Sequence, residues 1–253
     1  MMTQTEIESL ERAVLAAVAP PEIEEMPGWL IGFDSSTVGR AKSAVPISHD
    51  APDEVAIDAI AARYVARSMP AIFRIPSIDS FDSARRVLDS RGLRECKPTQ
   101  MQVAATRDVL RISGRRDALV STTADDEWAG VFLGEGFDPV DGASRVQVLR
   151  RAKDSLYASV RDDEPGGANR VVAGGVLSLS NGWASIHGMR TAKSYRGRGL
   201  ASRIIATLAG IALERGYERM MLQVERNNET AQKLYARCGF TVAWSYAYWE
   251  PAA

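Results

Sequence analysis

The sequence has few cysteines and histidines, two of each in 253 residues, and no long uninterrupted apolar run. Cys96 and Cys238 are too few for a disulfide framework or a four-ligand zinc site, so the fold must depend on burial and no metal is expected. The amino terminus has no basic segment followed by an apolar core, and no stretch reaches the roughly 18 apolar residues of a membrane-spanning helix. We therefore expect a cytoplasmic protein that does not contact a membrane.

The chain also lacks an excess of charge of either sign, with 31 Lys and Arg against 32 Asp and Glu. Its basic residues are not interleaved with the aromatic platforms that bind single-stranded nucleic acid, so no nucleic-acid partner is expected. The remaining composition, 45% hydrophobic and 25% charged, is typical of a soluble globular protein.

The first half of the chain alternates helical and extended patterns. A capping-box spacing, Thr5 with Glu8, opens an amphipathic pattern that predicts a surface helix ending before Pro20 and Pro21. The patterns further along predict a strand over 29–33, a hairpin partner reaching 47, a helix over 53–67, a strand over 71–75 and a helix over 80–91.

Residues 107–127 show no clean period, and we place a boundary there between an N-terminal α/β lobe, 1–110, and a second domain, 111–253. Asn181-Gly182 separates two strand patterns and predicts a tight hairpin. The patterns predict short helices near 128–132 and 144–151, strands over 156–160, 170–179, 183–191, 220–224 and 240–248, and helices over 200–215 and 229–237. This alternation indicates an α/β or α+β fold with a mixed sheet.

The most informative segment runs from Tyr195 to Ala201, between a predicted strand and a long helix. It reads Tyr-Arg196-Gly197-Arg198-Gly199-Leu200-Ala201. Glycines at the start of a helix let backbone N–H groups converge on an anion, and arginines add charge, so the segment predicts a phosphate site. It is neither a P-loop, which needs Lys followed by Ser or Thr, nor a dinucleotide fingerprint, whose third glycine is Ser202 here. A glycine-rich connection with solvated arginines is the structural alternative.

A second motif lies further along the chain, where Asn228, Ala231, Leu234 and Tyr235 precede Cys238-Gly239-Phe240. Together with Arg196, Gly199 and Ala201 this resembles the GNAT superfamily of N-acetyltransferases over roughly residues 125–250. The resemblance implies a GNAT fold, with a mixed, mostly antiparallel central sheet flanked by helices, and acetyl-CoA as cosubstrate with an amine as acceptor.

The resemblance also assigns residues to the cofactor. It implies that the backbone of Arg196, Gly197, Arg198, Gly199, Leu200 and Ala201 holds the pyrophosphate. The strand end at Met189, Arg190 and Thr191 would pair with the pantetheine arm, on one side of a gap where this strand splays from the strand of Gln223. Asn228 would bind the cofactor, or simply cap the following helix.

Catalytic roles follow from the same resemblance. Tyr235 would protonate the leaving thiolate, against the alternative that it is a core aromatic. His187, nine residues before Arg196, is a candidate base, with a half-buried strand histidine as the alternative; Glu225 is the second candidate. A branch acting on protein N-termini has a glutamate at the position of Gln223, so that base assignment does not transfer.

The N-terminal half contains a segment similar to the second motif. Residues 84–93 align with 231–240, which places Leu88 opposite Tyr235. One hypothesis is that the N-terminal lobe is a degenerate GNAT-like copy that does not hold acetyl-CoA and shapes the acceptor site. The activity predicted is transfer of an acetyl group to a primary amine of unknown identity; the alternative is a non-catalytic acyl-CoA-binding sensor or scaffold.

Overall fold

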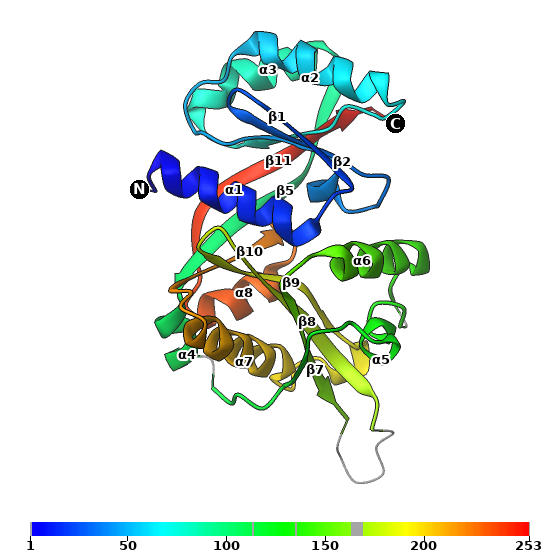
Figure 1. The fold of residues 1–253 in the computed structure, drawn as a ribbon, viewed down its shortest axis with the longest axis vertical. Coiled ribbons are helices and arrows are strands. Elements are labelled where there is room, and N and C mark those ends of the chain that lie inside the picture. Colours follow the sequence, from blue (N-terminus) through cyan, green and yellow to red (C-terminus); the bar gives the residue numbers. More distant parts are fainter. Residues whose placement is uncertain (1, 113, 135, 163–168, 253) are drawn as a thin grey trace.

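The computed structural model describes residues 2–112, 114–134, 136–162 and 169–252. One continuous eleven-stranded sheet runs through it in the order β1-β2-β3-β4-β11-β5-β10-β9-β8-β7-β6 (Figure 1). Only the β3–β4 and β9–β10 pairs in this sheet are parallel. Helices flank the sheet, so the predicted mixed, mostly antiparallel GNAT-type sheet is confirmed.

The N-terminal lobe begins with a hairpin and continues as strand, helix, strand and helix. Its elements are β1 (Glu22–Met26), β2 (Trp29–Phe33), a 3-10 turn η1 (Gly39–Ala41), β3 (Ala44–Pro46), α2 (Glu54–Ala66), β4 (Phe73–Pro76), a second 3-10 turn η2 (Asp79–Phe81) and α3 (Asp82–Ser90). Ile57 and Ile60 of α2 and Leu88 of α3 are fully buried against this part of the sheet. The apolar positions that predicted these two helices therefore form their buried faces.

From β7 onward, the C-terminal lobe follows the same order of strands and α-helices. It contains α4 (Thr106–Ile112), β6 (Leu119–Ser121), α5 (Asp126–Gly130), α6 (Pro139–Arg151), β7 (Ser155–Arg161), β8 (Val171–Ser180), β9 (Trp183–Thr191), a 3-10 turn η3 (Lys193–Tyr195), α7 (Leu200–Glu214), β10 (Arg219–Glu225) and α8 (Glu229–Arg237). The β8–β9 turn has positive φ at both Asn181 (48°) and Gly182 (74°), so the predicted tight hairpin is confirmed.

Two strands cross between the lobes at the centre of the sheet. β5 (Leu93–Ala105) pairs with β10 of the C-terminal lobe, β11 (Thr241–Pro251) pairs with β4 of the N-terminal lobe, and the two pair with each other. Each lobe is thus completed by a strand from the other half of the chain. When the lobes are exchanged, the order of strands β1 to β5 and β7 to β11 is unchanged, which supports the degenerate repeat. The division at 110/111 stays a prediction about sequence segments.

The central strand β5 is the longest element that sequence patterns did not predict. Pro98 falls within it, and proline normally excludes an inner strand. In the structure Lys97 has a positive φ of 49°. The register with β11 shifts here, from Tyr246–Thr99 to Tyr248–Cys96. A β-bulge therefore accommodates the proline, and the surrounding strands on both sides stabilise what local propensity does not. β1, α4 and β6 were missed as well.

Helix α1 (Gln4–Val18) joins the two lobes instead of lying on the surface, which corrects the sequence-based expectation. It packs on β8 and β9, and Leu15 and Val18 contact Val148 of α6 in a cluster shared with the N-terminal lobe. Glu11 on its buried face pairs with Arg74 of β4, with 2.5 Å between carboxylate oxygen and guanidinium nitrogen. Figure 1 shows α1 crossing the middle of the molecule. The described part of the chain holds no helix with the length and apolarity needed to cross a membrane.

Candidate active site

Strands β9 and β10 separate into a fork, as the resemblance led us to expect. Their parallel pairing ends at Ile186 and Leu222, although β9 continues along β8 to Thr191 and β10 continues along β5 to Glu225. The facing backbone groups beyond that point have no strand between them. The fork is therefore an edge at which an extended chain with amide groups could hydrogen-bond.

A β-bulge lies on β9 at the base of the fork. Gly188 and Met189 together oppose one residue of β8, and Gly188 has a positive φ of 56°. A Cβ at this glycine would lie 2.9 Å from Leu149 Cδ1. Because a bulge re-aims the backbone groups that follow it, glycine here sets the direction in which β9 faces the gap.

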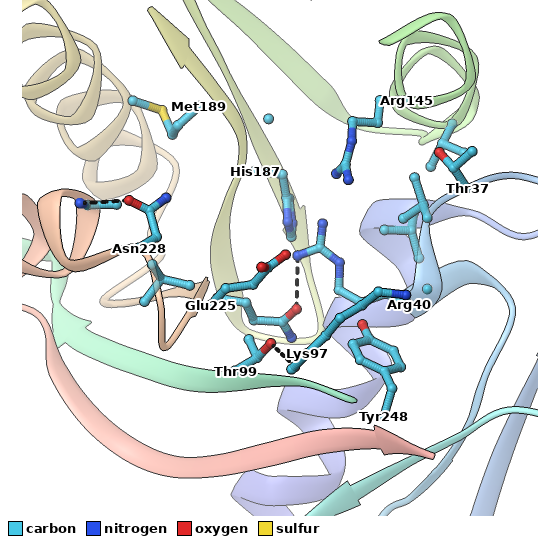
Figure 2. Close-up of a pocket in the computed structure, with 18 of the residues that line it drawn as sticks. Thr37, Arg40, Lys97, Thr99, Arg145, His187, Met189, Glu225, Asn228 and Tyr248 are labelled. Carbon is cyan, nitrogen blue, oxygen red and sulfur yellow. Dashed lines mark hydrogen bonds between the residues drawn. The ribbon is translucent and has the colours of Figure 1, made fainter. Parts of the chain in front are cut away.

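A cavity of about 610 Å³ opens at the mouth of the fork (Figure 2). Both lobes line it. The C-terminal lobe supplies residues of α6, β9, β10 and α8, and the N-terminal lobe supplies the η1 turn and the strand crossing. The polar lining residues are Thr37, Arg40, Lys42, Lys97, Thr99, Arg145, His187, Arg190, Gln223, Glu225, Asn227, Asn228, Tyr235, Tyr246, Tyr248 and Glu250.

The predicted site residues fall into two groups. Met189, Arg190, Asn228, Tyr235, His187 and Glu225 line the cavity, whereas Thr191 and the loop from Arg196 to Ala201 do not. The loop lies outside, at the start of α7, which directly follows β9 in the chain by way of η3.

The glycine loop presents an uncapped helix N-terminus. Gly197 and Gly199 have φ values of 80° and 78°, which only glycine adopts readily. Gly199 is the N-cap of α7, no side chain accepts a hydrogen bond from the first turn, and no acidic residue lies in it. Arg196 is exposed and donates from Nε to the Thr191 carbonyl, at 3.3 Å. The first turn is therefore electrostatically suited to an anion.

Tyr235 of α8 is 7% exposed and lines the cavity. Burial raises the pKa of its hydroxyl to about 12. Its ring packs edge-on to Phe240, so it also serves the core. The hydroxyl therefore stays protonated near neutral pH and can donate a hydrogen bond into the cavity.

His187 is buried and lines the cavity from β9. Its Nε2 lies 2.5 Å from Ser185 Oγ, and its Nδ1 has no hydrogen-bond partner. Burial, with a further contribution from Arg40, lowers the pKa of His187 well below 6.5. The imidazole is therefore neutral at physiological pH and a weak base.

Glu225 ends β10 and is exposed at the cavity. Its main-chain carbonyl accepts hydrogen bonds from the Asn228 amide and the Gln232 side chain. Asn228 caps α8 by accepting from the Ala231 amide at 3.1 Å, as its alternative role predicted. That bond uses the side-chain oxygen, so the side-chain amide of Asn228 can still donate to a ligand.

Sequence reasoning missed the part of the site that the N-terminal lobe supplies. Arg40 of η1 donates from Nη1 to Gln223 Oε1 at 2.9 Å, and the Tyr246 hydroxyl donates to the same oxygen at 3.1 Å. Arg40 lies 183 positions from Gln223 in the sequence. No local pattern marks it, because only the packing of the lobes brings η1 to the fork. Among the described residues no group of three His, Cys, Asp or Glu is arranged to hold a metal.

Comparison with known proteins agrees with this architecture. Residues 125–240 match the model of the acetyltransferase (GNAT) family. The chain is 25% identical over 252 residues to an N-acetyltransferase of Bacillus subtilis named YobR, described as uncharacterized, and the match covers 96% of this chain and 98% of that protein.

Solved structures share the fold over nearly the whole chain. A GCN5-related N-acetyltransferase from Kribbella flavida has a TM-score of 0.70 at 15% identity, covering 98% of this chain and 96% of that one. A tandem GNAT protein from the clavulanic acid biosynthesis pathway has a TM-score of 0.61 at 14% identity, covering 98% and 95%. The two-lobed arrangement therefore recurs in solved structures.

Proposed function

Because this chain belongs to the GNAT superfamily of N-acetyltransferases, we propose that it transfers an acetyl group from acetyl-CoA directly to a primary amine. The observation that carries the proposal is the fork between β9 and β10, which opens into a cavity lined by Tyr235 and is followed in the chain by the uncapped start of α7.

Acetyl-CoA fits the groups that this region presents. The backbone N–H groups of Arg196 to Ala201 would hold the pyrophosphate, since the first turn of α7 has no side-chain cap and no acidic residue. The backbone of Met189, Arg190 and Thr191 would hydrogen-bond the amides of the pantetheine arm, and the Asn228 side-chain amide would donate to the same arm. The acetyl thioester supplies the electrophilic carbonyl carbon.

The transfer requires one bond to form and one to break. The amine lone pair forms the C–N bond as the C–S bond breaks and the electron pair leaves on sulfur. Tyr235, protonated at neutral pH, would donate a hydrogen bond to that sulfur as its negative charge develops. Backbone N–H groups after the bulge at Gly188 would polarise the carbonyl, and most of the acceleration would come from positioning the two reactants.

The amine must also lose a proton. Glu225 would accept this proton, directly or through water. Its carboxylate is accessible at the cavity and makes no ion pair with another described residue. His187 is neutral and could accept a hydrogen bond from the amine or donate one to it. Its lowered pKa makes it the weaker base of the two.

Calorimetric titration with acetyl-CoA, with ADP as the control for generic phosphate binding, tests the proposal. We expect one-to-one binding in the micromolar range and clearly weaker binding of ADP. Absent binding, or equal affinity for ADP, would overturn the cofactor assignment. Binding without acetylation of any amine in a broad panel would favour the alternative, a non-catalytic acyl-CoA-binding protein.

A further inference from the structure

The cavity has more positive than negative charge at its walls, and the cations are not equally paired. Two of the five have carboxylate partners: Lys97 is 3.3 Å from Glu250, and Arg145 is 2.6 Å from Asp141. Arg40, Lys42 and Arg190 form no ion pair with any described residue. Glu250 acts electrostatically on Lys42, and Asp141 and Glu225 act on Arg190. Cations still outnumber carboxylates among the residues that line the cavity, which indicates an anionic ligand.

Arg40 is held in place without losing its charge. It is half-buried, and the partner that fixes its guanidinium is the neutral side-chain oxygen of Gln223, which Tyr246 also contacts. A guanidinium has five N–H donors in a planar fork, so most of them stay available. A carboxylate in the place of Gln223 would have neutralised this cation. The glutamine therefore orients Arg40 and leaves its charge for a ligand.

A second observation at the same wall also indicates a ligand. His187 is 4% exposed and lines the cavity, yet its Nδ1 has no hydrogen-bond partner. Buried polar atoms in native proteins are nearly always paired. Figure 2 places His187 beside Arg40 in the cavity, so a polar ligand bound to Arg40 would be in the same region as this nitrogen.

Arg40 is not placed to serve the phosphates of acetyl-CoA. Those are assigned to the start of α7, which does not line the cavity, whereas Arg40 enters from the N-terminal lobe. In Figure 2 Met189 and Asn228, on the proposed cofactor side, lie apart from Arg40, Lys97 and Tyr248. Arg40 thus belongs to the acceptor side of the cavity, whereas Arg190 lies on β9, the strand assigned to the pantetheine arm.

The same region offers a group of opposite sign. Figure 2 shows Glu225 directed toward Arg40, but the two form no ion pair. A carboxylate and a guanidinium that face one cavity without pairing are complementary to a molecule with both an ammonium and an anionic group. Glu225 would attract the amine and later its proton, and Arg40 would hold the anion.

We propose that the acceptor is a primary amine that also carries a carboxylate, as an amino acid does, with the carboxylate bound by Arg40 and attracted by Lys42. This inference rests on the proposed acetyltransferase function. The planar fork of Arg40 fits a carboxylate and a phosphate equally well. The carboxylate carries a single negative charge and is therefore repelled less by Glu225 and Glu250, which also line the cavity.

The test compares amines in matched pairs. The full-length protein is assayed for release of CoA with amino acids, with the carboxamides of the same amino acids, and with phosphoethanolamine and spermidine. We expect kcat/KM to favour the carboxylates by at least about tenfold, the effect of one charge-assisted hydrogen bond. In Arg40→Gln this preference should fall about tenfold, mainly through KM, and Arg40→Lys should retain part of it.

Matched controls separate this inference from the proposed function. Lys153→Gln removes an exposed cation that does not line the cavity, and the preference should be unchanged. Calorimetry should show that Arg40→Gln binds acetyl-CoA as the wild type does, and thermal unfolding should show that it is folded.

Three outcomes of the amine assay overturn the inference. These are equal use of amino acids and their carboxamides, a preference for phosphoethanolamine or spermidine, and a preference for amino acids that Arg40→Gln leaves unchanged. The inference is also overturned if the protein binds acetyl-CoA but acetylates the amine of no amino acid. Failure to bind acetyl-CoA overturns the proposed function itself.

Discussion

The two lobes share one order of elements but differ at the start of the helix that joins their parallel strands. In the C-terminal lobe α7 begins at a glycine with no side-chain cap and no acid in its first turn. In the N-terminal lobe α2 is capped by Asp53, which accepts from the Val55 amide, and Glu54 follows. A carboxylate already occupies the anion position of α2, so only α7 suits a phosphate.

The lobes differ again one helix later. Tyr235 of α8 reaches the cavity, whereas Leu88 at the corresponding position of α3 is fully buried in the core. The loop between the second and third strands is longer in the N-terminal lobe. Residues 34–43, which include η1, join β2 and β3, while Asn181-Gly182 alone joins β8 and β9. Through this loop the N-terminal lobe places Arg40 at the other lobe's fork.

The largest expected effect comes from breaking the connection between the lobes. Glu11→Ala leaves the fully buried Arg74 guanidinium without its partner, so the free energy of unfolding should fall by about 3–5 kcal/mol in urea denaturation. Glu22→Ala, which breaks an exposed pair with Arg67, should cost less than about 1 kcal/mol. The double variant Glu11→Leu/Arg74→Met should recover most of the loss. Similar losses for Glu11→Ala and Glu22→Ala would contradict this account.

The tyrosine that distinguishes α8 from α3 gives the next effect. Tyr235→Phe should reduce kcat about a hundredfold, because the hydrogen bond to the leaving sulfur is lost, while calorimetric affinity for acetyl-CoA stays the same. Tyr217→Phe, half-buried and outside the cavity, is the matched control. Because the pKa of Tyr235 is about 12, its ionisation should not limit activity below about pH 11. Unchanged kcat in Tyr235→Phe would remove this residue from the mechanism.

A smaller change would give α7 the acidic start of α2. Ala201→Glu puts a carboxylate into the first turn of α7 and should weaken acetyl-CoA binding about tenfold relative to Ala201→Gln, which has the same size without the charge. The difference should shrink at high salt, because screening weakens the repulsion between carboxylate and phosphates. If the two variants bind equally, the loop does not hold the phosphates.

A further effect that needs no change in ligand binding concerns His187, the buried histidine of the C-terminal lobe. Its pKa in the folded protein lies well below 6.5, so the unfolded chain binds a proton that the folded chain does not as pH falls below about 6.5. Stability should therefore fall on acidification from pH 7 to 5, with this residue contributing at most about 1.4 kcal/mol per pH unit. Urea denaturation at a series of pH values should show that the free energy of unfolding of His187→Gln depends less steeply on pH than that of the wild type. Equal dependence on pH would mean that His187 binds its proton at the same pH in the folded and the unfolded chain, and that burial does not lower its pKa.

The sequence determined those parts of the molecule that depend on neighbouring residues. Helical periods, the Asn181-Gly182 turn and the glycines before α7 act within one element, so the fork's flanking strands, α7 and α8 could be located from their own patterns. The segment 84–93 indicated the repeat in the same way, because its helix and strand repeat the order around Tyr235.

Tertiary structure decided what depends on distant segments meeting. β5 contains Pro98 and is a strand only because β10 and β11 pair with it on both sides. Arg40 enters the cavity because β5 and β11 cross between the lobes and α1 packs against both η1 and the strands β8 and β9, and Gln223 fixes Arg40 across 183 positions of sequence. Local propensity encodes neither contact. The charge that we propose to select the acceptor is therefore set by the packing of the two lobes.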